Sequence, residues 1–439
     1  MRPSESRGID RREFVKSAVA IGGMSALSAC LGRSGDENDE DDEDDVSIPA
    51  GTDDPTSLPD RQHAWNGALP SDDHGNHVLA SHHVLLYADY AGDGTPTADE
   101  RETVESALQS LERAFEWSSE GLLFTVGYSP RYFDRFDEAL PDSVDLPEPA
   151  ALTSFEDPDL DTNDVVVHLA SDSGAALLEA EEALKGNTDT VNGVEMDAHL
   201  GGVLDLPEEF PGRRTGFVGD GLPAENNDVS GIPDEADVPE ESPLYMGFKS
   251  GFDKNQATED GVTIPEGPFA GGTTQHVSRI RLRLDDWYVE QDQEERVSEM
   301  FCPAHAEEGT VEGVGENLGD DSGAGDCVET IEEDARSAGR VGHAQKTARA
   351  RRDGRPVILR RDFDSTDRGE AGLHFLAVQE GISDFVATKT AMAGEDLTDT
   401  PTIRQRVNNG IQEYTFVKRR GNFLLPPRTH RALPTPRPE

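Results

Sequence analysis

Basic residues are scarce in this chain of 439 residues. Lysine and arginine together number 39, of which only seven are lysine, whereas aspartate and glutamate number 89, so the formal net charge is −50. The sequence has no basic patch that could neutralise a run of phosphates. A nucleic-acid partner is therefore not expected.

Apolar residues are also few, at 34% of the chain. They nevertheless cluster into periodic runs, so the chain can build a core and is not of the disordered class. Its length exceeds that of an ordinary single domain, and we expect one large domain or two fused units.

The abundant acidic residues are spread along the whole chain. Such a surface stays soluble through self-repulsion and hydration, and it suits high salt, where screening removes the repulsion. The composition favours a halophilic protein from a salt-loving archaeon. The alternative is an ordinary protein with an acidic tail, but the acid excess persists within the segments that we expect to fold.

The N-terminal 30 residues resemble an export signal. Arg11-Arg12 is followed by Phe14 and Lys16, as in twin-arginine signals, and the apolar stretch from Ser17 to Ala29 is too short to span a bilayer. Leu27-Ser28-Ala29-Cys30 resembles a lipobox. Lipidation of Cys30 would anchor the mature chain to the outer face of the membrane. In the alternative, Cys30 belongs only to the apolar part of the signal.

Residues 31–61 have the composition of a linker. Asp36 to Asp45 is acidic at nine of ten positions, and Pro49 to Pro59 is rich in turn residues. Such sequence cannot form a packed core, so we expect an extended, solvated linker. Folded sequence is expected from about residue 62. The twin-arginine pathway carries folded proteins, which favours a protein that takes up a cofactor before export.

Residues 62–240 predict a first α+β half. Thr97 and Glu100 form a capping box before a helix in which Val104, Leu108 and Leu111 recur at helical spacing. The remaining expected elements are strands at 82–90, 122–128 and 164–170, a helix at 173–184 and a last strand near 193–205. This order matches a ferredoxin-like split βαβ unit.

Residues 241–439 repeat that order. The expected strands are 276–284, 357–360, 373–378 and 414–417, with helices at 291–301 and 382–392. The predicted fold class is therefore α+β, with two ferredoxin-like halves that each pack helices on an antiparallel sheet. Between Phe301 and Arg340 lies a Gly-rich, acidic insertion, which we expect to be a surface excursion.

An ordered series of segments resembles the dye-decolorizing peroxidase superfamily over residues 62–428. Chlorite dismutases share the fold class, but Gly247–Gly251 and Ile358–Arg361 favour the peroxidase branch. The segments that carry the resemblance are Leu122–Ser129 with Tyr132-Phe133, Thr153–Phe155, Asp164–Ala170, Gly247–Gly251, Gly271–Thr273, Arg279–Leu282 with Trp287, Gly342-His343, Ile358–Arg361 and Gly372–Gln379.

The resemblance implies haem b as cofactor and His343 as the iron ligand. It places an arginine on the peroxide side of the haem, namely Arg360, or Arg361 if the register is shifted by one. Arg279 and His374 are expected to line the same pocket. Without the resemblance, His343 next to a glycine-rich turn would be interpreted as a surface histidine, and Arg360 as a partner for one of the many acidic residues.

Ser250 departs from the family pattern. It occupies the position of the catalytic aspartate in the family's GxxDG motif, and a serine hydroxyl has too high a pKa to act as a base near neutrality. Ser250 could instead hold a water that relays a proton, and Asp253 lies three residues further on. Haem binding is thus better supported by the sequence than peroxidase turnover.

Cys302 and Cys327 lie at the two ends of the insertion. An exported location permits a disulfide between them, worth about 3 kcal/mol in the chain-entropy model; two free thiols are the alternative. The nearby His305 does not by itself complete a metal site.

Three functions remain open. The first is a haem peroxidase at the cell surface that reduces hydrogen peroxide with a small organic electron donor. The second is a haem-binding or iron-acquisition lipoprotein that has lost turnover, and the third is a membrane-tethered protein with the fold but no cofactor. In each case the membrane is contacted only through the lipid anchor, and the resemblance also allows a homo-oligomer.

Overall fold

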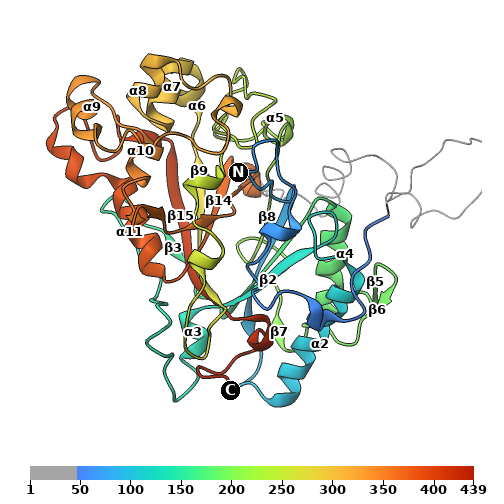
Figure 1. Cartoon of the computed structure of the whole chain (residues 1–439). Helices are drawn as coiled ribbons and strands as arrows, with labels where there is room; N and C mark the ends of the chain where they lie inside the picture. The colour runs from blue at the N-terminus through green and yellow to red at the C-terminus, as the bar shows by residue number, and fades with distance from the viewer. Residues whose placement is uncertain (1–46) are drawn as a thin grey trace, which may run out of the picture.

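The computed structural model of the protein describes residues 47–439. The predicted export signal, the predicted lipobox with Cys30 and most of the predicted linker lie outside the described residues. The described chain folds around one mixed sheet flanked by helices, and its two halves stand side by side (Figure 1).

The first half is built on four antiparallel strands in the order β8-β1-β4-β2. They are β1 (His82–Tyr90), β2 (Leu123–Tyr128), β4 (Val165–Ser171) and β8 (Arg213–Phe217). Helices α2 (Ala98–Ala114) and α4 (Gly174–Lys185) contribute Leu108, Leu111 and Leu177 to the apolar core that covers this sheet. The predicted capping box of Thr97 and Glu100 is present at the start of α2.

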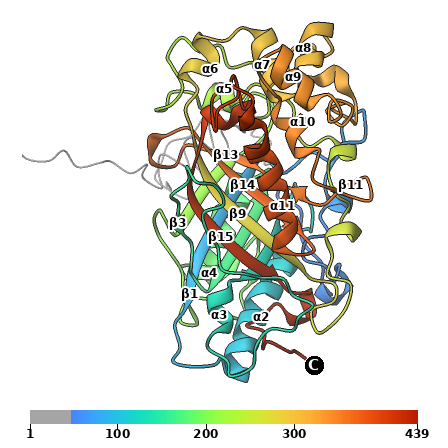
Figure 2. The same cartoon turned by 90° about the vertical axis from the view of Figure 1, so that its left-hand side faces the viewer.

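The second half repeats this arrangement. Its strands are β9 (Thr273–Leu282), β12 (Leu359–Arg360), β13 (Phe363–Ser365), β14 (Gly372–Gln379) and β15 (Thr415–Leu425). β15 pairs β9, β9 pairs β14, and β14 pairs both β12 and β13, all antiparallel. Helix α11 (Ile382–Ala393) lies across these strands, with α10 (His343–Thr347) beside it (Figure 2).

The two halves join at two seams. Asp364 of β13 pairs Phe217 of β8, and Leu424 of β15 pairs Tyr128 of β2, so that the strands form a closed ring. An apolar cluster drawn from both halves includes Leu85, Val277 and Phe423. The predicted fold class, a duplicated ferredoxin-like α+β architecture, is confirmed. The halves are nevertheless one folded body, because they share the sheet and part of the core.

The smaller elements complete the path of the chain. The remaining helices of four or more residues are α3 (Pro130–Phe133), α5 (Leu222–Glu225), α6 (Asp285–Val289), α7 (Gln293–Met300), α8 (Pro303–Glu308) and α9 (Ile331–Ser337), together with the 3-10 helices Glu395–Asp399 and Gly410–Glu413. The short strands are β3 (Asp159–Leu160), β5 (Thr190–Val191), β6 (Val194–Glu195), β7 (Leu204–Asp205), β10 (Arg351–Arg352) and β11 (Arg355–Pro356). Within the described part of the chain, every helix is too short or too polar to cross a bilayer.

The last strand of the first half was predicted at the wrong place. Residues 193–205 contain only β6 and β7, because Asn192 and Gly193, both at positive φ, close a two-residue hairpin there. The strand that completes the sheet is β8, which opens with two arginines. Arg213 pairs with the buried Glu181, and Arg214 with the buried Asp161, so hydropathy gave no indication of this strand.

Two segments expected to be solvated are packed instead. Thr52 N donates to Glu112 O at 3.1 Å and Glu116 N to Pro49 O at 2.9 Å, so the chain from residue 47 onward is not an extended linker. The insertion between Phe301 and Arg340 is not a surface excursion either. It folds into α8 and α9 and buries residues along its length, among them Val314, Ala324, Cys327 and Ala335.

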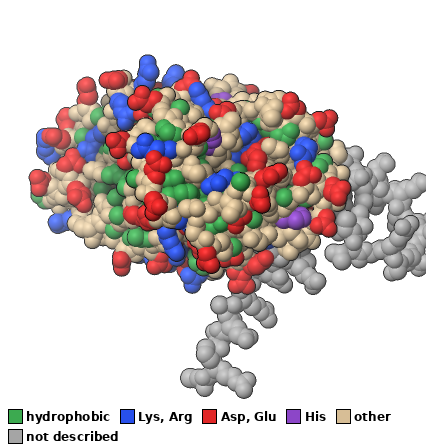
Figure 3. All heavy atoms as spheres, turned by 90° about the horizontal axis from the view of Figure 1, so that it is seen from below, with side chains coloured by type: hydrophobic (Ala, Val, Ile, Leu, Met, Phe, Trp, Pro, Cys, Tyr) green, Lys and Arg blue, Asp and Glu red, His purple; other side chains and the backbone are tan. Residues whose placement is uncertain are grey.

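The surface carries the expected acidic character. Acidic side chains are distributed over the face shown in Figure 3 and are interspersed with fewer basic ones. The chain is therefore acidic on its folded body as well as in its N-terminal segment.

Candidate functional site

A cavity of about 180 Å³ lies in the second half, between the sheet and the helices α10 and α11. Ser278 and Ile280 of β9, Phe375 of β14 and Val417 of β15 form its sheet side. The insertion contributes Ser322, Ala324 and Gly325, which is why its packing matters for the site. Most of the lining is apolar, and its cationic members are Lys249, Arg351, Arg360, Lys389 and Arg420.

His343 lines this cavity from the first turn of α10. Gly342 precedes it as the N-cap, and a Cβ at position 342 would collide with the backbone of Phe301. Gln345 closes the turn: its side-chain oxygen accepts from Gly342 N at 3.1 Å, and its own N–H donates to Phe301 O at 3.2 Å. The glycine before His343 is thus required by packing, since only glycine allows the helix to begin this close to residue 301.

The imidazole of His343 is held neutral. Burial lowers its pKa to about 3, and the positive charges of Lys346 and Arg360 lower it further. Nδ1 is buried and has no hydrogen-bond partner among residues 47–439, which leaves Nε2 as the ring nitrogen that can reach a ligand in the cavity. A neutral imidazole with a free lone pair is the form that binds a metal.

The cavity adjoins a second, larger space, which we call the cleft, and three side chains lie where the two meet: Lys249, Ser250 and Arg360. All three line both the 180 Å³ cavity and the neighbouring cleft of about 840 Å³. Ser250 is carried by a turn in which Gly251 adopts φ +80°. The neighbouring Lys249 forms an ion pair with Asp72, so its charge is already compensated.

Arg360 belongs to β12. Two contacts fix its position, one made by its backbone N–H and one made by its guanidinium with a carboxylate. Its N–H donates to Gln256 Oε1 at 2.8 Å, and its Nη1 lies 3.4 Å from Asp362 Oδ2. Of Arg360 and Arg361, the two candidates from the sequence, Arg360 is the one that lines the cavity. Arg361 lines only the cleft, where it lies over the Trp65 ring at 4.5 Å and donates to His63 O at 2.9 Å.

Asp362 was missed by the sequence reasoning. It lines the cleft, and burial raises the pKa of its carboxyl to about 6, although Arg360 and the N–H of Leu376 lower it. The donation from Leu376 N to Oδ1 measures 3.1 Å. Residues two apart in an extended segment face the same side, so Asp362 could have been placed beside Arg360 from its spacing alone.

Residues 80–427 match the family described as "Family of unknown function (DUF7405)". The chain belongs to this family. The match covers both ferredoxin-like halves and includes His343, Ser250 and Arg360.

Two solved structures share the fold of this DUF7405 chain. Ferric DtpA from Streptomyces lividans is 18% identical, with a TM-score of 0.55 over 87% of this chain and 94% of that one. A variant of DypB from Rhodococcus jostii RHA1 in complex with heme is 14% identical, with a TM-score of 0.52 over 84% of this chain and 97% of that one. Both are DyP-type peroxidases, so the predicted resemblance is confirmed at the level of the fold.

A local similarity links the chain to another class of protein. A glutamyl-tRNA(Gln) amidotransferase component from Lactococcus lactis subsp. cremoris (strain SK11) is 27% identical over 135 residues, as is its counterpart from subsp. lactis (strain IL1403). The match covers 31% of this chain, and the chain spans about a quarter of the length of these curated relatives, 26%. It is too short to indicate a shared fold.

Two predicted pocket residues of this DUF7405 member lie elsewhere. Arg279 alternates with Ser278 and Ile280 on β9 and therefore faces away from the cavity, where its Nη2 approaches Glu370 Oε2 at 3.3 Å. His374 precedes the lining residue Phe375 and faces away for the same reason; its Nε2 lies 3.3 Å from Asp367 Oδ2. The two strands were predicted correctly, but the prediction that Arg279 and His374 face the cavity was wrong.

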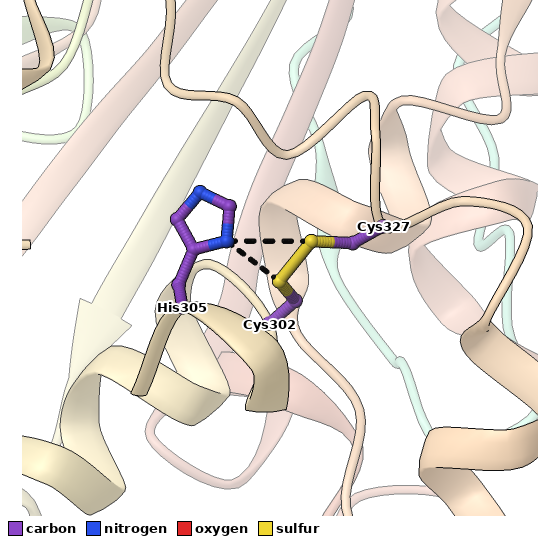
Figure 4. Close-up of side chains that lie close together, drawn as sticks. All are labelled: Cys302, His305 and Cys327. Carbon is purple, nitrogen blue, oxygen red and sulfur yellow. Dashed lines mark hydrogen bonds between the residues drawn. A yellow bond between two sulfur atoms is a disulfide. The ribbon is translucent and has the colours of Figure 1, made fainter. Parts of the chain in front are cut away.

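Cys302 and Cys327 are joined as a disulfide in the structure. Cys302 follows Phe301 at the start of α8, and Cys327 lies between the cavity-lining residue Gly325 and α9. His305 lies against both sulfur atoms (Figure 4).

Proposed function

We propose that this protein binds haem b in the His343 cavity and reduces hydrogen peroxide with a small organic electron donor. The observation that carries the proposal is the meeting of three side chains at one cavity. His343, whose neutral imidazole offers Nε2, lines the same cavity as Ser250 and Arg360. His343 lies 93 residues after Ser250 in the chain, and the fold is that of DyP-type peroxidases, one of which is described in complex with heme.

The donor set fits a haem. His343 offers a neutral nitrogen, apolar side chains such as Phe375, Phe385 and Met392 line the cavity, and Arg351 pairs with no carboxylate among the described residues. Arg351 is therefore suited to an acidic group at the edge of the ligand. The cavity of about 180 Å³ is smaller than the roughly 300–1,000 Å³ typical of pockets for ligands of this size. Binding thus requires flexible lining side chains such as Met300 and Met392 to move.

A bound haem would supply the redox-active iron at which peroxide is reduced. His343 would hold that iron through Nε2, and its imidazole is neutral across the physiological pH range because burial lowers its pKa to about 3. Arg360 places positive charge next to the position where negative charge develops as peroxide is cleaved. Asp362, whose pKa of about 6 lies near neutrality, can accept or return a proton on the cleft side.

Ser250 and Asp362 together replace the missing aspartate. The Ser250 hydroxyl has no partner that competes for it among the described side chains, and it lines both the cavity and the cleft. It can therefore orient a water between peroxide and the carboxylate of Asp362. In this proposal Arg360 stabilises the developing negative charge, and Asp362 accepts and returns the proton through that water.

The reducing substrate would approach through the larger cleft. Its volume of about 840 Å³ is in the range of small-molecule pockets. Acidic side chains line it, including Asp172, Asp220, Glu241 and Glu316. A neutral or cationic aromatic donor is therefore favoured over an anionic one.

A non-enzymatic haem-binding lipoprotein is the second candidate. Two observations favour it: Ser250 stands where a carboxylate would be, and Nδ1 of His343 lacks the carboxylate partner that makes a ligating histidine more basic. The nearest charged neighbour on α10 is instead Lys346, whose ammonium donates to Asn409 O at 2.8 Å.

We further propose that the protein acts at the cell surface of a halophile. The twin arginines, the lipobox with Cys30 and the acidic stretch 36–45 support export and lipid anchoring. The acidic residues of the folded body support function in high salt.

Peroxide reactivity separates the two candidates. Haem-loaded protein in high salt is mixed with hydrogen peroxide, and both the absorption spectrum and the oxidation of an aromatic dye are followed. A spectral change together with dye oxidation above the rate of free haem supports the peroxidase. An unchanged spectrum would contradict the peroxidase, and haem binding would remain as the function.

A further inference from the structure

Three potential metal ligands converge at the start of α8. Cys302 is the N-cap of this helix and His305 is its third residue, so both side chains lie on the same face, one turn apart. Cys327 reaches them from the segment before α9. The two sulfur atoms and Nδ1 of His305 all lie within 4.8 Å of one another, and all three residues are buried (Figure 4).

The orientation of His305 is fixed by its other nitrogen. Nε2 lies 2.9 Å from the carbonyl oxygen of Ser322, which can only accept a hydrogen bond, so Nε2 carries the proton. Gly323, at φ +69°, lets that carbonyl approach: a Cβ at position 323 would lie 2.9 Å from Nε2. In the neutral ring the lone pair is therefore on Nδ1, which points at Cys302 Sγ at 2.9 Å and Cys327 Sγ at 3.3 Å.

This lone pair has no suitable partner in a disulfide. A disulfide has no hydrogen to donate, whereas two thiolates and a ring nitrogen directed at one point form a ligand set for a metal ion. Thiolate and imidazole ligands select zinc and copper(I) over harder cations. Two thiolates with Zn²⁺ and neutral imidazole have no net charge, which suits a buried position; with Cu⁺ one negative charge would remain.

We propose that Cys302, His305 and Cys327 form a Cys₂His site for Zn²⁺, and that the disulfide is the alternative state of the same two sulfurs. The newly made chain carries both cysteines as thiols. Zn²⁺ that reaches the folded site first displaces the two thiol protons and forms two Zn–S bonds and one Zn–N bond. The fourth position stays open to a small ligand, as in zinc sites with three protein ligands.

Zinc at this site would order the wall of the His343 cavity. Gln345 Nε2 donates to the carbonyl oxygen of Cys327 at 2.7 Å, while the oxygen of the same amide accepts from Gly342 N. Ser322, which fixes His305, also lines the cavity. The cluster therefore connects the insertion to the first turn of α10, two residues from His343.

The test uses the full chain, reduced with a phosphine that does not bind zinc. In this step the phosphine takes the oxygen of one water and the two sulfurs take its protons. After incubation with Zn²⁺ and removal of the excess, zinc and iron per chain are measured by atomic emission. We expect one zinc per chain in the wild type, a loss of at least tenfold in Cys302→Ser and Cys327→Ser, and at least tenfold weaker binding in His305→Ala.

His74→Ala is the matched control, because His74 is exposed and lies outside the cluster. Its zinc content should equal that of the wild type. A second measurement needs no mutation: glutathione disulfide takes two electrons from the two thiolates, becomes two glutathione thiols and should release the zinc as Cys302–Cys327 forms. The proposal is overturned if the reduced wild type retains less than a tenth of a zinc per chain, or if the cysteine variants retain as much as the wild type. Both readouts are independent of haem.

Discussion

The guanidinium of Arg360 lies 3.4 Å from the carboxylate of Asp362, and the two residues border the cleft that adjoins the His343 cavity. Burial keeps the pKa of Asp362 at about 6, despite the positive charge of Arg360. The pair thus combines a permanent cation with a carboxyl group that titrates close to neutrality. In the proposed function the pair takes the place of the carboxylate that Ser250 lacks.

Replacing Asp362 with asparagine tests its role in proton transfer. The carboxylate is ionised above about pH 6 and protonated below it, so the wild-type rate of reaction with peroxide should fall as the pH drops through 6. Asp362→Asn should abolish this limb of the pH profile and lower the rate near pH 7 by about 100-fold, the lower range for lost acid–base catalysis. Rapid-mixing absorption from pH 4.5 to 8 measures both effects.

Asp253→Asn is the control for that experiment. Asp253 also lines the cleft but does not contact Arg360. Its profile should keep the limb near pH 6. If Asp362→Asn kept the wild-type profile, Asp362 would have no part in the reaction.

Removing the charge of Arg360 should slow the reaction with peroxide but spare haem binding. Loss of one group that stabilises developing charge costs about 10²–10³-fold in rate. We expect Arg360→Ala to fall in this range in kcat while its haem content stays at the wild-type level, and Arg355→Ala, on the exposed β11, to keep wild-type kinetics. Equal activity of the two variants would exclude Arg360 from catalysis.

Restoring a carboxylate at position 250 distinguishes the two proposed functions. Ser250 lines the cavity, and Gly251 at φ +80° keeps the turn, so an aspartate would place its carboxylate at the cavity. If the protein is a peroxidase that works without this group, Ser250→Asp should raise the turnover of an aromatic donor by at least tenfold. A rate that stays at the level of free haem would favour the non-enzymatic haem-binding function.

Because His343 is buried in its neutral form, the stability of the haem-free protein should depend on pH. Its pKa is about 3 in the folded chain and 6.5 when solvated, so the unfolded chain binds one more proton between these values. His343 should therefore make stability fall by about 1.4 kcal/mol for each pH unit below 6.5. Denaturant unfolding at pH 4.5, 5.5 and 7.5 should show this slope reduced by that amount in His343→Gln.

His74→Gln serves as the control for this measurement because His74 is exposed. Its slope should match the wild type. An unchanged slope in His343→Gln would mean that the imidazole is protonated, or solvated, in the folded chain.

The repeated pattern of strands and helices could be predicted because most of these elements carry regular apolar spacing. Leu108 and Leu111 of α2 and the valines of β4 show this clearly. Strand β8 could not, because it opens with Arg213 and the buried Arg214, which are neutralised by Glu181 and Asp161, two acids distant in sequence. The cavity walls from the insertion were missed for a related reason: Gly- and acid-rich sequence is typical of loops, and only tertiary contacts bury Ala324 and Cys327.

At the site, the resemblance located His343, Ser250 and Arg360, which the structure brings to one cavity. It did not give the inward face of each strand, so Arg279 and His374 were assigned to the wrong side. Asp362 was missed because its effect depends on burial, which raises its pKa. Neither burial nor the convergence of Cys302, His305 and Cys327 can be read from local sequence.

The most direct test of the account is an absorption spectrum of the full chain, purified in high salt from a haem-supplemented culture, alongside His343→Ala. We predict a strong Soret band in the wild type that is lost or markedly shifted in the variant, while the variant keeps its fold by circular dichroism. A wild type without a Soret band would contradict haem binding, and a band unchanged in His343→Ala would contradict His343 as the iron ligand.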